Sequence, residues 1–225
     1  MSRPLSLHEA RELFGADFFG PDVVARALGE TPAPRDGASE STAPPFSRAD
    51  AEAARKAGGF LIHRPATLAG GAALTLAVLH QRCNGSSAAA AMRFRSDDPW
   101  FLGQAFAESE TPEAGWALAI KEPWRATLNQ TYDRASEALA DFPGGAAATP
   151  WRRRRAVEIV LDCLVVAAVR GERLLSNAWD WSSSSAADGG LINVGGFGAG
   201  GLEVLSYSKA VKHGALGICP TLVAR

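Results

Sequence analysis

The sequence predicts an α+β fold, in which short antiparallel strands, long loops and a long central helix follow a small helical head. Residues 177–225 contain short runs of alternating apolar residues separated by glycine, serine and aspartate, a pattern typical of strands joined by turns. Residues 151–170 are almost entirely apolar beyond the first turn, as expected of a helix that is covered on most sides. With 225 residues, 47% of them hydrophobic, the chain can bury a core as one domain or as two small ones.

Two short helices are predicted at the start of the chain. Ser6 and Glu9 have the spacing of a capping box, in which each side chain pairs with the backbone amide of the other residue. Pro21 is typical of the first turn of a helix, and Gly29 is typical of a helix end. Residues 1–29 are therefore expected to form the helical head.

The next segment is the best candidate for a domain boundary. Residues 30–46 concentrate proline, alanine, serine and threonine with little to bury, which predicts a linker or a surface strap. We expect residues 47–225 to form the main domain, with a ligand-display module at 177–225. Within residues 47–170, apolar periodicity and capping residues predict helices at 47–56, 100–106, 127–142 and 151–170, and strands at 60–62, 88–95 and 115–121. Residues 67–83 are predicted to form a turn at Gly70-Gly71 followed by a helix.

The net charge and the cysteine content limit which partners and which cellular compartment are expected. The chain has 23 basic and 24 acidic side chains, so electrostatics give no reason to expect nucleic acid or a membrane as the main partner. Cys83, Cys163 and Cys219 are odd in number and far apart, which favours a reducing compartment, and we expect a cytoplasmic protein. The first residues lack a signal-peptide core, and the apolar runs are too short to span a bilayer.

Motifs for metal binding and catalysis are weak. His80 and Cys83 lie three residues apart on a predicted helix, but no second pair of ligands accompanies them. Residues 196–201 match G-x-G-x-x-G, yet too few residues follow for a dinucleotide-binding fold, so a glycine-rich turn is predicted. The serine run at 182–185 lacks the G-x-S-x-G elbow. We expect no metal, no cofactor and no nucleophilic catalysis.

Four consecutive arginines, Arg152 to Arg155, begin the predicted long helix. One interpretation is a docking patch for a phosphate or an acidic partner. The other is a solvated helix end neutralised by carboxylates such as Glu158, and the balanced net charge favours it.

The last quarter of the chain suggests a recognition surface. Trp179 and Trp181 share one face of a predicted strand, and residues 206–213 place tyrosine, serine and lysine on a loop between strands. These are adaptable contact residues in binding sites, although composition equally allows an ordinary surface connection.

The same region resembles the C-terminal module of C-type-lectin-like bacterial proteins. The matching residues are Trp-Ser-Ser-Ser at 181–184, Asp-Gly-Gly at 188–190, Val-Gly-Gly-Phe at 194–197, Gly-Gly-Leu-Glu-Val at 200–204 and Leu-Gly-Ile at 216–218. That group includes formylglycine-generating-enzyme-like domains and variable proteins diversified by retroelements. Residues 115–122 and 171–175 are also similar to uncharacterised bacterial proteins that end in this module.

The resemblance implies a C-type-lectin-like fold in which the two ends of the chain meet in an antiparallel sheet. It also implies a ligand-binding face formed by Trp179, Trp181, Tyr207, Ser208, Lys209, Lys212 and His213. The module has only Cys219, whereas the formylglycine-generating enzymes use a pair of cysteines that bind copper, and it lacks the calcium loop of sugar-binding lectins.

Three hypotheses about function follow. The leading one is a non-catalytic binding protein whose C-terminal loops meet a protein or a small ligand, with a sequence that a retroelement diversifies. The second is an enzyme with an unrecognised site of the formylglycine-generating-enzyme-like class, which would need a cleft with perturbed ionisable groups. The third is a structural subunit of a larger assembly.

Overall fold

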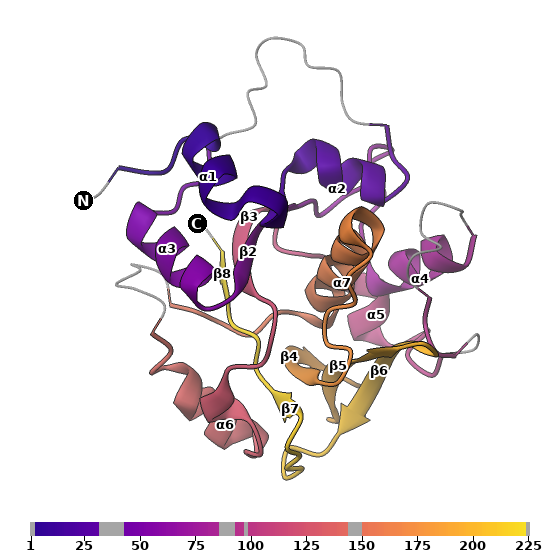
Figure 1. The fold of residues 1–225 in the computed structure, drawn as a ribbon. Helices are drawn as coiled ribbons and strands as arrows, with labels where there is room; N and C mark the ends of the chain where they lie inside the picture. The colour runs from indigo at the N-terminus through magenta and orange to yellow at the C-terminus, as the bar shows by residue number, and fades with distance from the viewer. Residues whose placement is uncertain (1–2, 32–42, 86–92, 97–98, 144–149, 224–225) are drawn as a thin grey trace.

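The computed structural model describes residues 3–31, 43–85, 93–96, 99–143 and 150–223 (Figure 1). It confirms an α+β fold. The described α-helices are α1 (Leu7–Phe14), α2 (Pro21–Ala27), α3 (Arg48–Lys56), α4 (Leu76–Gly85), α5 (Ala105–Ser109), α6 (Tyr132–Leu139) and α7 (Ala156–Arg170). The strands are β1 (Phe18–Phe19), β2 (Gly59–Arg64), β3 (Gly115–Ile120), β4 (Trp179–Ser185), β5 (Leu191–Gly198), β6 (Gly201–Tyr207), β7 (Leu216–Gly217) and β8 (Thr221–Val223).

The first sheet has the order β1-β2-β3-β8. Strands β2 and β3 pair antiparallel along their whole length, β1 runs parallel to β2, and β8 is antiparallel to β3. The first and last strands therefore lie at opposite edges of this sheet. The two ends of the chain thus share one sheet, as expected, but they do not pair with each other, because β2 and β3 lie between them, and β1 makes the sheet mixed rather than antiparallel.

The second sheet has the order β6-β5-β4-β7, and its first three strands form an antiparallel meander. The strands predicted in the last quarter of the chain are thus confirmed. The glycines of residues 196–201 end β5 and begin β6, where Gly198 pairs with Gly201. The G-x-G-x-x-G match is therefore a hairpin turn, as predicted.

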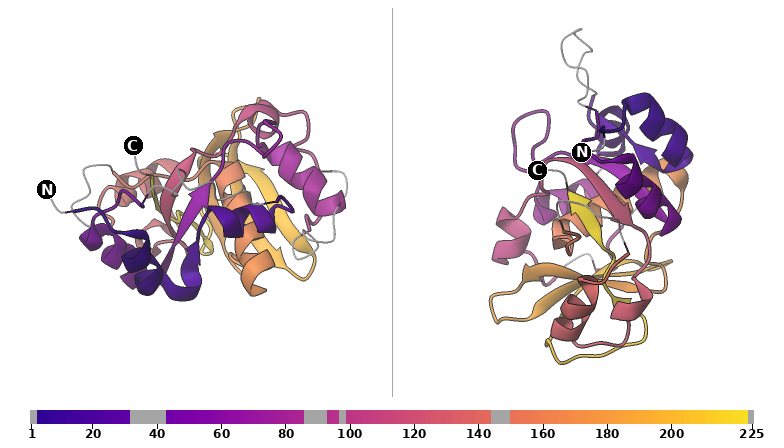
Figure 2. Two further views of the ribbon diagram at one scale, coloured as in Figure 1. Left: turned by 90° about the horizontal axis from the view of Figure 1, so that it is seen from above. Right: turned by 90° about the vertical axis from the view of Figure 1, so that its left-hand side faces the viewer.

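Helix α7 fills the space beside the second sheet. It packs on β4 and β5, and helices α2, α4 and α5 cover its other sides (Figures 1 and 2). Every residue from Ala156 to Ala167 is buried, as the apolar sequence of this helix predicts.

This helix begins five residues later than predicted. Residues 151–155 are extended, and Arg152 pairs with Thr221 in an antiparallel bridge. The helix starts after Arg155, whose backbone amide donates to the Glu158 carboxylate. Pairing of Arg152 with Thr221 of β8 therefore replaces the first turn of the predicted helix.

The helical head packs against the rest of the chain. Ser6 and Glu9 form the predicted capping box of α1, and Pro21 lies in the first turn of α2. Val24 and Leu28 belong to the same buried cluster as α7, and β1 is part of the first sheet. Of the predicted linker at 30–46, residues 32–42 lie outside the described part of the chain.

The remaining predicted elements are confirmed with shifted ends. Strands at 60–62 and 115–121 correspond to β2 and β3, and the predicted helix at 47–56 is α3. The turn predicted at Gly70-Gly71 is present, and the helix predicted after it is α4. The predicted helices at 100–106 and 127–142 are displaced or shorter, as α5 and α6. Most of the predicted strand at 88–95 lies outside the described residues, and Phe94 makes an isolated parallel bridge to Leu202. None of the helices in the described ranges has the length and apolar character needed to cross a bilayer.

Candidate functional site

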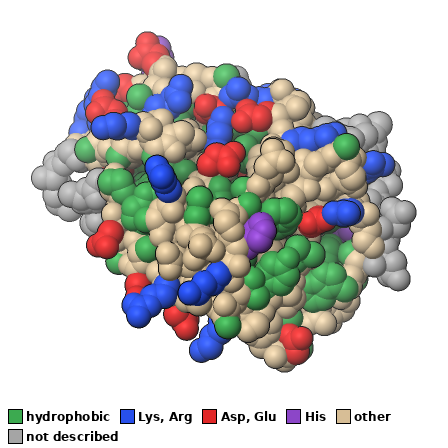
Figure 3. Space-filling view, turned by 60° about the horizontal axis from the view of Figure 1, so that its bottom comes forward, with side chains coloured by type: hydrophobic (Ala, Val, Ile, Leu, Met, Phe, Trp, Pro, Cys, Tyr) green, Lys and Arg blue, Asp and Glu red, His purple; other side chains and the backbone are tan. Residues whose placement is uncertain are grey.

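The outer face of the second sheet carries a cluster of aromatic and aliphatic side chains. Ile192, Val194 and Val204 point inward and share the buried cluster of α7. Because successive side chains of a strand alternate between its faces, the intervening residues point away from α7. These outward residues, here called the outer face, are Trp179, Trp181, Leu191, Asn193, Leu205 and Tyr207. Figure 3 shows hydrophobic side chains beside a histidine on the face of the molecule that is turned toward the viewer.

Trp181 belongs to the outer face but is covered rather than exposed. Its side chain is fully buried, with the rings of Tyr132 at 5.5 Å and Tyr207 at 6.2 Å between centroids. Tyr132 comes from α6, which covers this part of the sheet, and its hydroxyl donates to the Ser182 carbonyl. The structure therefore places Trp181, a predicted ligand contact, under Tyr132 of α6, where its side chain packs against Tyr207.

Trp179 is half-buried at the edge of the face. Its ring meets the ring of His213 edge-on at 5.9 Å, and its indole Nε1 is buried without a hydrogen-bond partner among the described residues. Gly196 makes room for the indole, because a Cβ at that position would lie 2.8 Å from Cζ2 of Trp179. The structure thus brings two predicted site residues, Trp179 and His213, into direct contact.

The loop after β6 displays the other predicted residues. Tyr207 is half-buried, whereas the side chains of Ser208, Lys209, Lys212 and His213 are exposed. The backbone of this loop is fixed, because the carbonyls of Lys209 and His213 accept hydrogen bonds from the amides of residues 132 and 129. The loop is therefore anchored through its main chain while its side chains face solvent.

Sequence reasoning missed several members of the surface. Leu191 and Leu205 lie in the predicted strand region at 177–225 and were not among the predicted site residues, although strand alternation alone would place them on this face. Asn193 lies opposite Trp181, and its Oδ1 is buried without a partner among the described residues, as is Nε1 of Trp181. Tyr132 could not have been found from spacing, because it reaches the sheet from a helix far away in the sequence.

The arginine run lies partly in the interior. Arg154 is 1% exposed and contacts both Asp162 on α7, at 2.8 Å, and Asp180 on β4, at 2.9 Å. Arg64 on β2 is fully buried and makes two hydrogen bonds to Asp162, of 3.0 and 2.6 Å. The backbone amide of Cys219 donates to Asp180. These groups form a buried ion-pair network that joins β2, α7 and β4.

The prediction for the arginine run is therefore confirmed in one respect and wrong in another. Neutralisation by carboxylates is confirmed, since Arg152 contacts Glu158 at 2.8 Å and Glu113 at 3.0 Å. A solvated helix end is wrong for Arg153 and Arg154, which are buried. The extended segment before α7 runs between the sheets, and this turns their side chains inward.

The pKa values of the buried acids differ with their partners. Burial raises the pKa of Asp180 to about 6, and the Arg154 charge offsets only part of that effect. Burial also acts on Glu158, but the Arg64 charge and the hydrogen bonds from Arg152 outweigh it and lower its pKa to about 2. Glu158 is thus held as a carboxylate far below neutral pH.

The candidate metal and thiol groups lie in apolar surroundings. The ring of His80 packs against Phe94 at 5.0 Å and Phe101 at 5.8 Å. Burial raises the pKa of Cys83 and of Cys163 to about 12, which disfavours the reactive thiolate. Over the described ranges, no group of three or more His, Cys, Asp or Glu side chains is placed to hold a metal ion.

Comparison of the chain with models of protein families, with curated proteins and with solved structures finds no match. The assignment of function therefore rests on the chemistry of the outer face and its loop.

Proposed function

We propose that the protein is a non-catalytic binding protein that meets a protein or small ligand through the outer face and residues 207–213. The observation that supports this most is the contact between Trp179 and His213 at the edge of a partly exposed apolar face. Aromatic side chains with a free polar group, surrounded by polar residues, are typical of recognition surfaces. Ser208, Lys209 and Lys212 supply such a polar rim.

The proposal extends to the class of protein. We infer a C-type-lectin-like domain of a cytoplasmic bacterial protein, in which a short-stranded sheet supports a ligand-contacting loop. The support is the anchoring of residues 208–213 through main-chain carbonyls, because such a loop tolerates side-chain changes without loss of its backbone hydrogen bonds.

Partner capture with surface variants tests the binding function. The purified protein and a Tyr207→Ala, His213→Ala double variant are immobilised and exposed to an extract of the source cells, and retained molecules are quantified by mass spectrometry. We expect a partner that the unchanged protein retains and that the double variant loses by about ten-fold or more, because central aromatic contacts dominate binding. Val169→Ala is the matched control, since Val169 is an exposed apolar residue on α7.

Circular dichroism and thermal melting must show that each variant folds. A folded double variant that retains the same molecules in the same yield as the Val169→Ala control would contradict the proposed surface.

We further propose that a retroelement diversifies this surface. Sequencing the gene across a clonal population would compare codons for residues 180–213 with codons for residues 60–121. We expect substitutions in the first range only, confined to adenine positions of a nearby template copy and concentrated at exposed positions such as Ser208 and Lys212. Uniform variation across both ranges would rule out diversification and leave the binding function untouched.

A further inference from the structure

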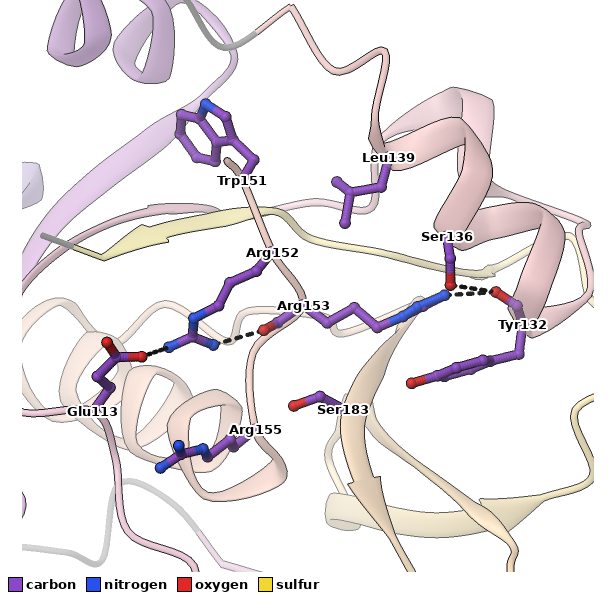
Figure 4. Close-up of a pocket in the computed structure, with 9 residues that line it drawn as sticks. All are labelled: Glu113, Tyr132, Ser136, Leu139, Trp151, Arg152, Arg153, Arg155 and Ser183. Atoms are coloured by element: carbon purple, nitrogen blue, oxygen red, sulfur yellow. Dashed lines mark hydrogen bonds and ion pairs between the residues drawn. The ribbon is translucent and has the colours of Figure 1, made fainter. Parts of the chain in front are cut away.

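A pocket lies between α6 and the extended segment that precedes α7. Its volume is about 470 Å³, which is within the range of small-molecule sites. Trp151 and Leu139 form an apolar wall, and Arg153, Arg155 and Ser183 form a polar one (Figure 4). The pocket therefore offers both an apolar surface and several hydrogen-bond donors.

Arg153 extends across this pocket toward α6 (Figure 4). Its guanidinium lies 3.7 Å from the centre of the Tyr132 ring, and its Nη2 donates to the Tyr132 carbonyl at 2.7 Å. The residue is only 7% exposed, yet its Nε and Nη1 have no hydrogen-bond partner among the described residues. Buried donors are costly to leave unpaired, and an anionic oxygen would satisfy them after a small shift of the pocket wall.

The positive charge of the pocket is not fully compensated. Arg152 is paired with Glu113 and Glu158, whereas Arg153 and Arg155 make no ion pair within the part of the chain that the structure describes. Arg155 instead donates to the Thr111 carbonyl at 2.8 Å. Burial lowers the pKa of Arg153, and the charges around it offset only part of this effect.

We propose that this pocket binds a small organic anion, with a carboxylate or phosphate group on an apolar body. The anionic group would lie beside Arg153, whose guanidinium would donate charge-assisted hydrogen bonds; Arg155 extends to the opposite side of the pocket (Figure 4) and adds a second positive charge to its lining. The Ser183 hydroxyl adds a donor, because its contact with the Arg154 carbonyl is long, at 3.4 Å. The apolar body would lie against Trp151 and Leu139.

Calorimetric titration with defined probes tests this site. The probes are benzoate and phenyl phosphate, with neutral benzyl alcohol and inorganic phosphate as comparisons. We expect at least one aromatic anion to bind saturably, and about ten-fold or more tighter than both comparisons, because charge-assisted hydrogen bonds and apolar contact act together. The tighter of the two aromatic anions identifies the carboxylate or the phosphate as the preferred group.

Arg155→Gln is the decisive variant, because Arg155 is partly exposed and its loss threatens the fold less than the loss of buried Arg153. We expect it to weaken binding by about three-fold or more, since a positive charge that lines the pocket is removed. Arg134→Gln on α6 is the matched control, because Arg134 is exposed and pairs with Glu137. Its affinity should stay unchanged.

Several outcomes would overturn the proposal. One is that neither aromatic anion binds saturably up to about 10 mM. Another is that inorganic phosphate binds as tightly as phenyl phosphate. The third is that a folded Arg155→Gln variant has the same affinity as the Arg134→Gln control. Partner capture through Tyr207 and His213 is scored separately, so either proposal can fail without the other.

Discussion

The four arginines at 152–155 are neighbours in sequence but have different roles. Arg152 and Arg154 pair with carboxylates, whereas Arg153 and Arg155 turn to the pocket without an ion pair among the described residues. Arg152, Arg153 and Arg155 all line the pocket, with Arg152 and Arg155 extending to one side and Arg153 to the other (Figure 4). The sequence alone predicted a helix here, and a helix would have placed the four side chains around one turn. The sequence alone therefore could not predict that Arg152 and Arg154 form ion pairs while Arg153 and Arg155 do not within the described residues.

The free energy of unfolding should depend on pH because of Glu158. Its pKa of about 2 lies below the ordinary value of 4.5, so the folded state favours the carboxylate. Its stabilising contribution is present above about pH 4.5 and is lost as the pH falls toward about 2. At about 1.4 kcal/mol per pKa unit, this contribution is on the order of 3 kcal/mol.

Urea unfolding of the unchanged protein and of Glu158→Gln measures this contribution. The difference between their unfolding free energies should be constant from about pH 7 to pH 5 and should shrink as the pH approaches 2. A difference that does not change with pH would mean that the Glu158 carboxylate is not the stabilising species.

At the scale of elements, the close packing of β5 on the chain beside it limits the size of the residues that β5 can contain. A Cβ at Gly195 would lie 2.1 Å from the Ala178 carbonyl oxygen, whereas a Cβ at Gly198 would meet nothing closer than 3.7 Å. We expect Gly195→Ala to destabilise the protein by about 1–3 kcal/mol, because two backbones must separate. Thermal melting would show a drop of roughly 3–10 °C for a chain of this size.

Gly198→Ala is the matched control on the same strand. It should melt within about 2 °C of the unchanged protein, since the new methyl group finds ordinary contacts. Equal melting temperatures for the two variants would show that β4 and β5 are not packed as closely as the structure places them.

Elements with local signals could be predicted from the sequence. The capping residues Ser6 and Ser47, and Pro21 in the first turn of its helix, identified α1, α3 and α2. Period-two alternation identified β3 and the strands of the second sheet. The start of α7 was wrong because Arg152 pairs with Thr221 of β8, a contact between residues far apart that no local pattern reports.

At the scale of the whole molecule, the buried ion-pair network links the two sheets. Arg64 on β2 and Asp180 on β4 are connected through Asp162 and Arg154. Sequence reasoning predicted the α+β class and most strands, but it could not predict sheet order or this link. Both depend on which distant side chains meet once the chain is folded. The same limit applies to the burial of Trp181, since only the packed structure shows that Tyr132 of α6 covers it.

We expect Asp162→Asn to destabilise both sheets together. Removing one partner leaves Arg64 and Arg154 without their shared carboxylate, which costs about 3–5 kcal/mol in buried pairs. Hydrogen exchange should show that amides of β2 and of β5 lose protection to the same extent. Asp133→Asn is the control, because Asp133 is exposed and forms a surface ion pair with Lys209, and its loss should leave both sheets protected. Loss of protection in one sheet alone would contradict a structural link between them.

The order of strands in the two sheets also has a kinetic consequence. Strands β4, β5 and β6 are consecutive hairpins, whereas β2 pairs with β3, and β3 with β8, across long stretches of intervening chain. Local hairpins close quickly, and pairing between distant segments is slow because more chain entropy is lost before contacts form. The outer face should therefore gain its shape early in refolding, and the slow phase should be the assembly of the first sheet around it.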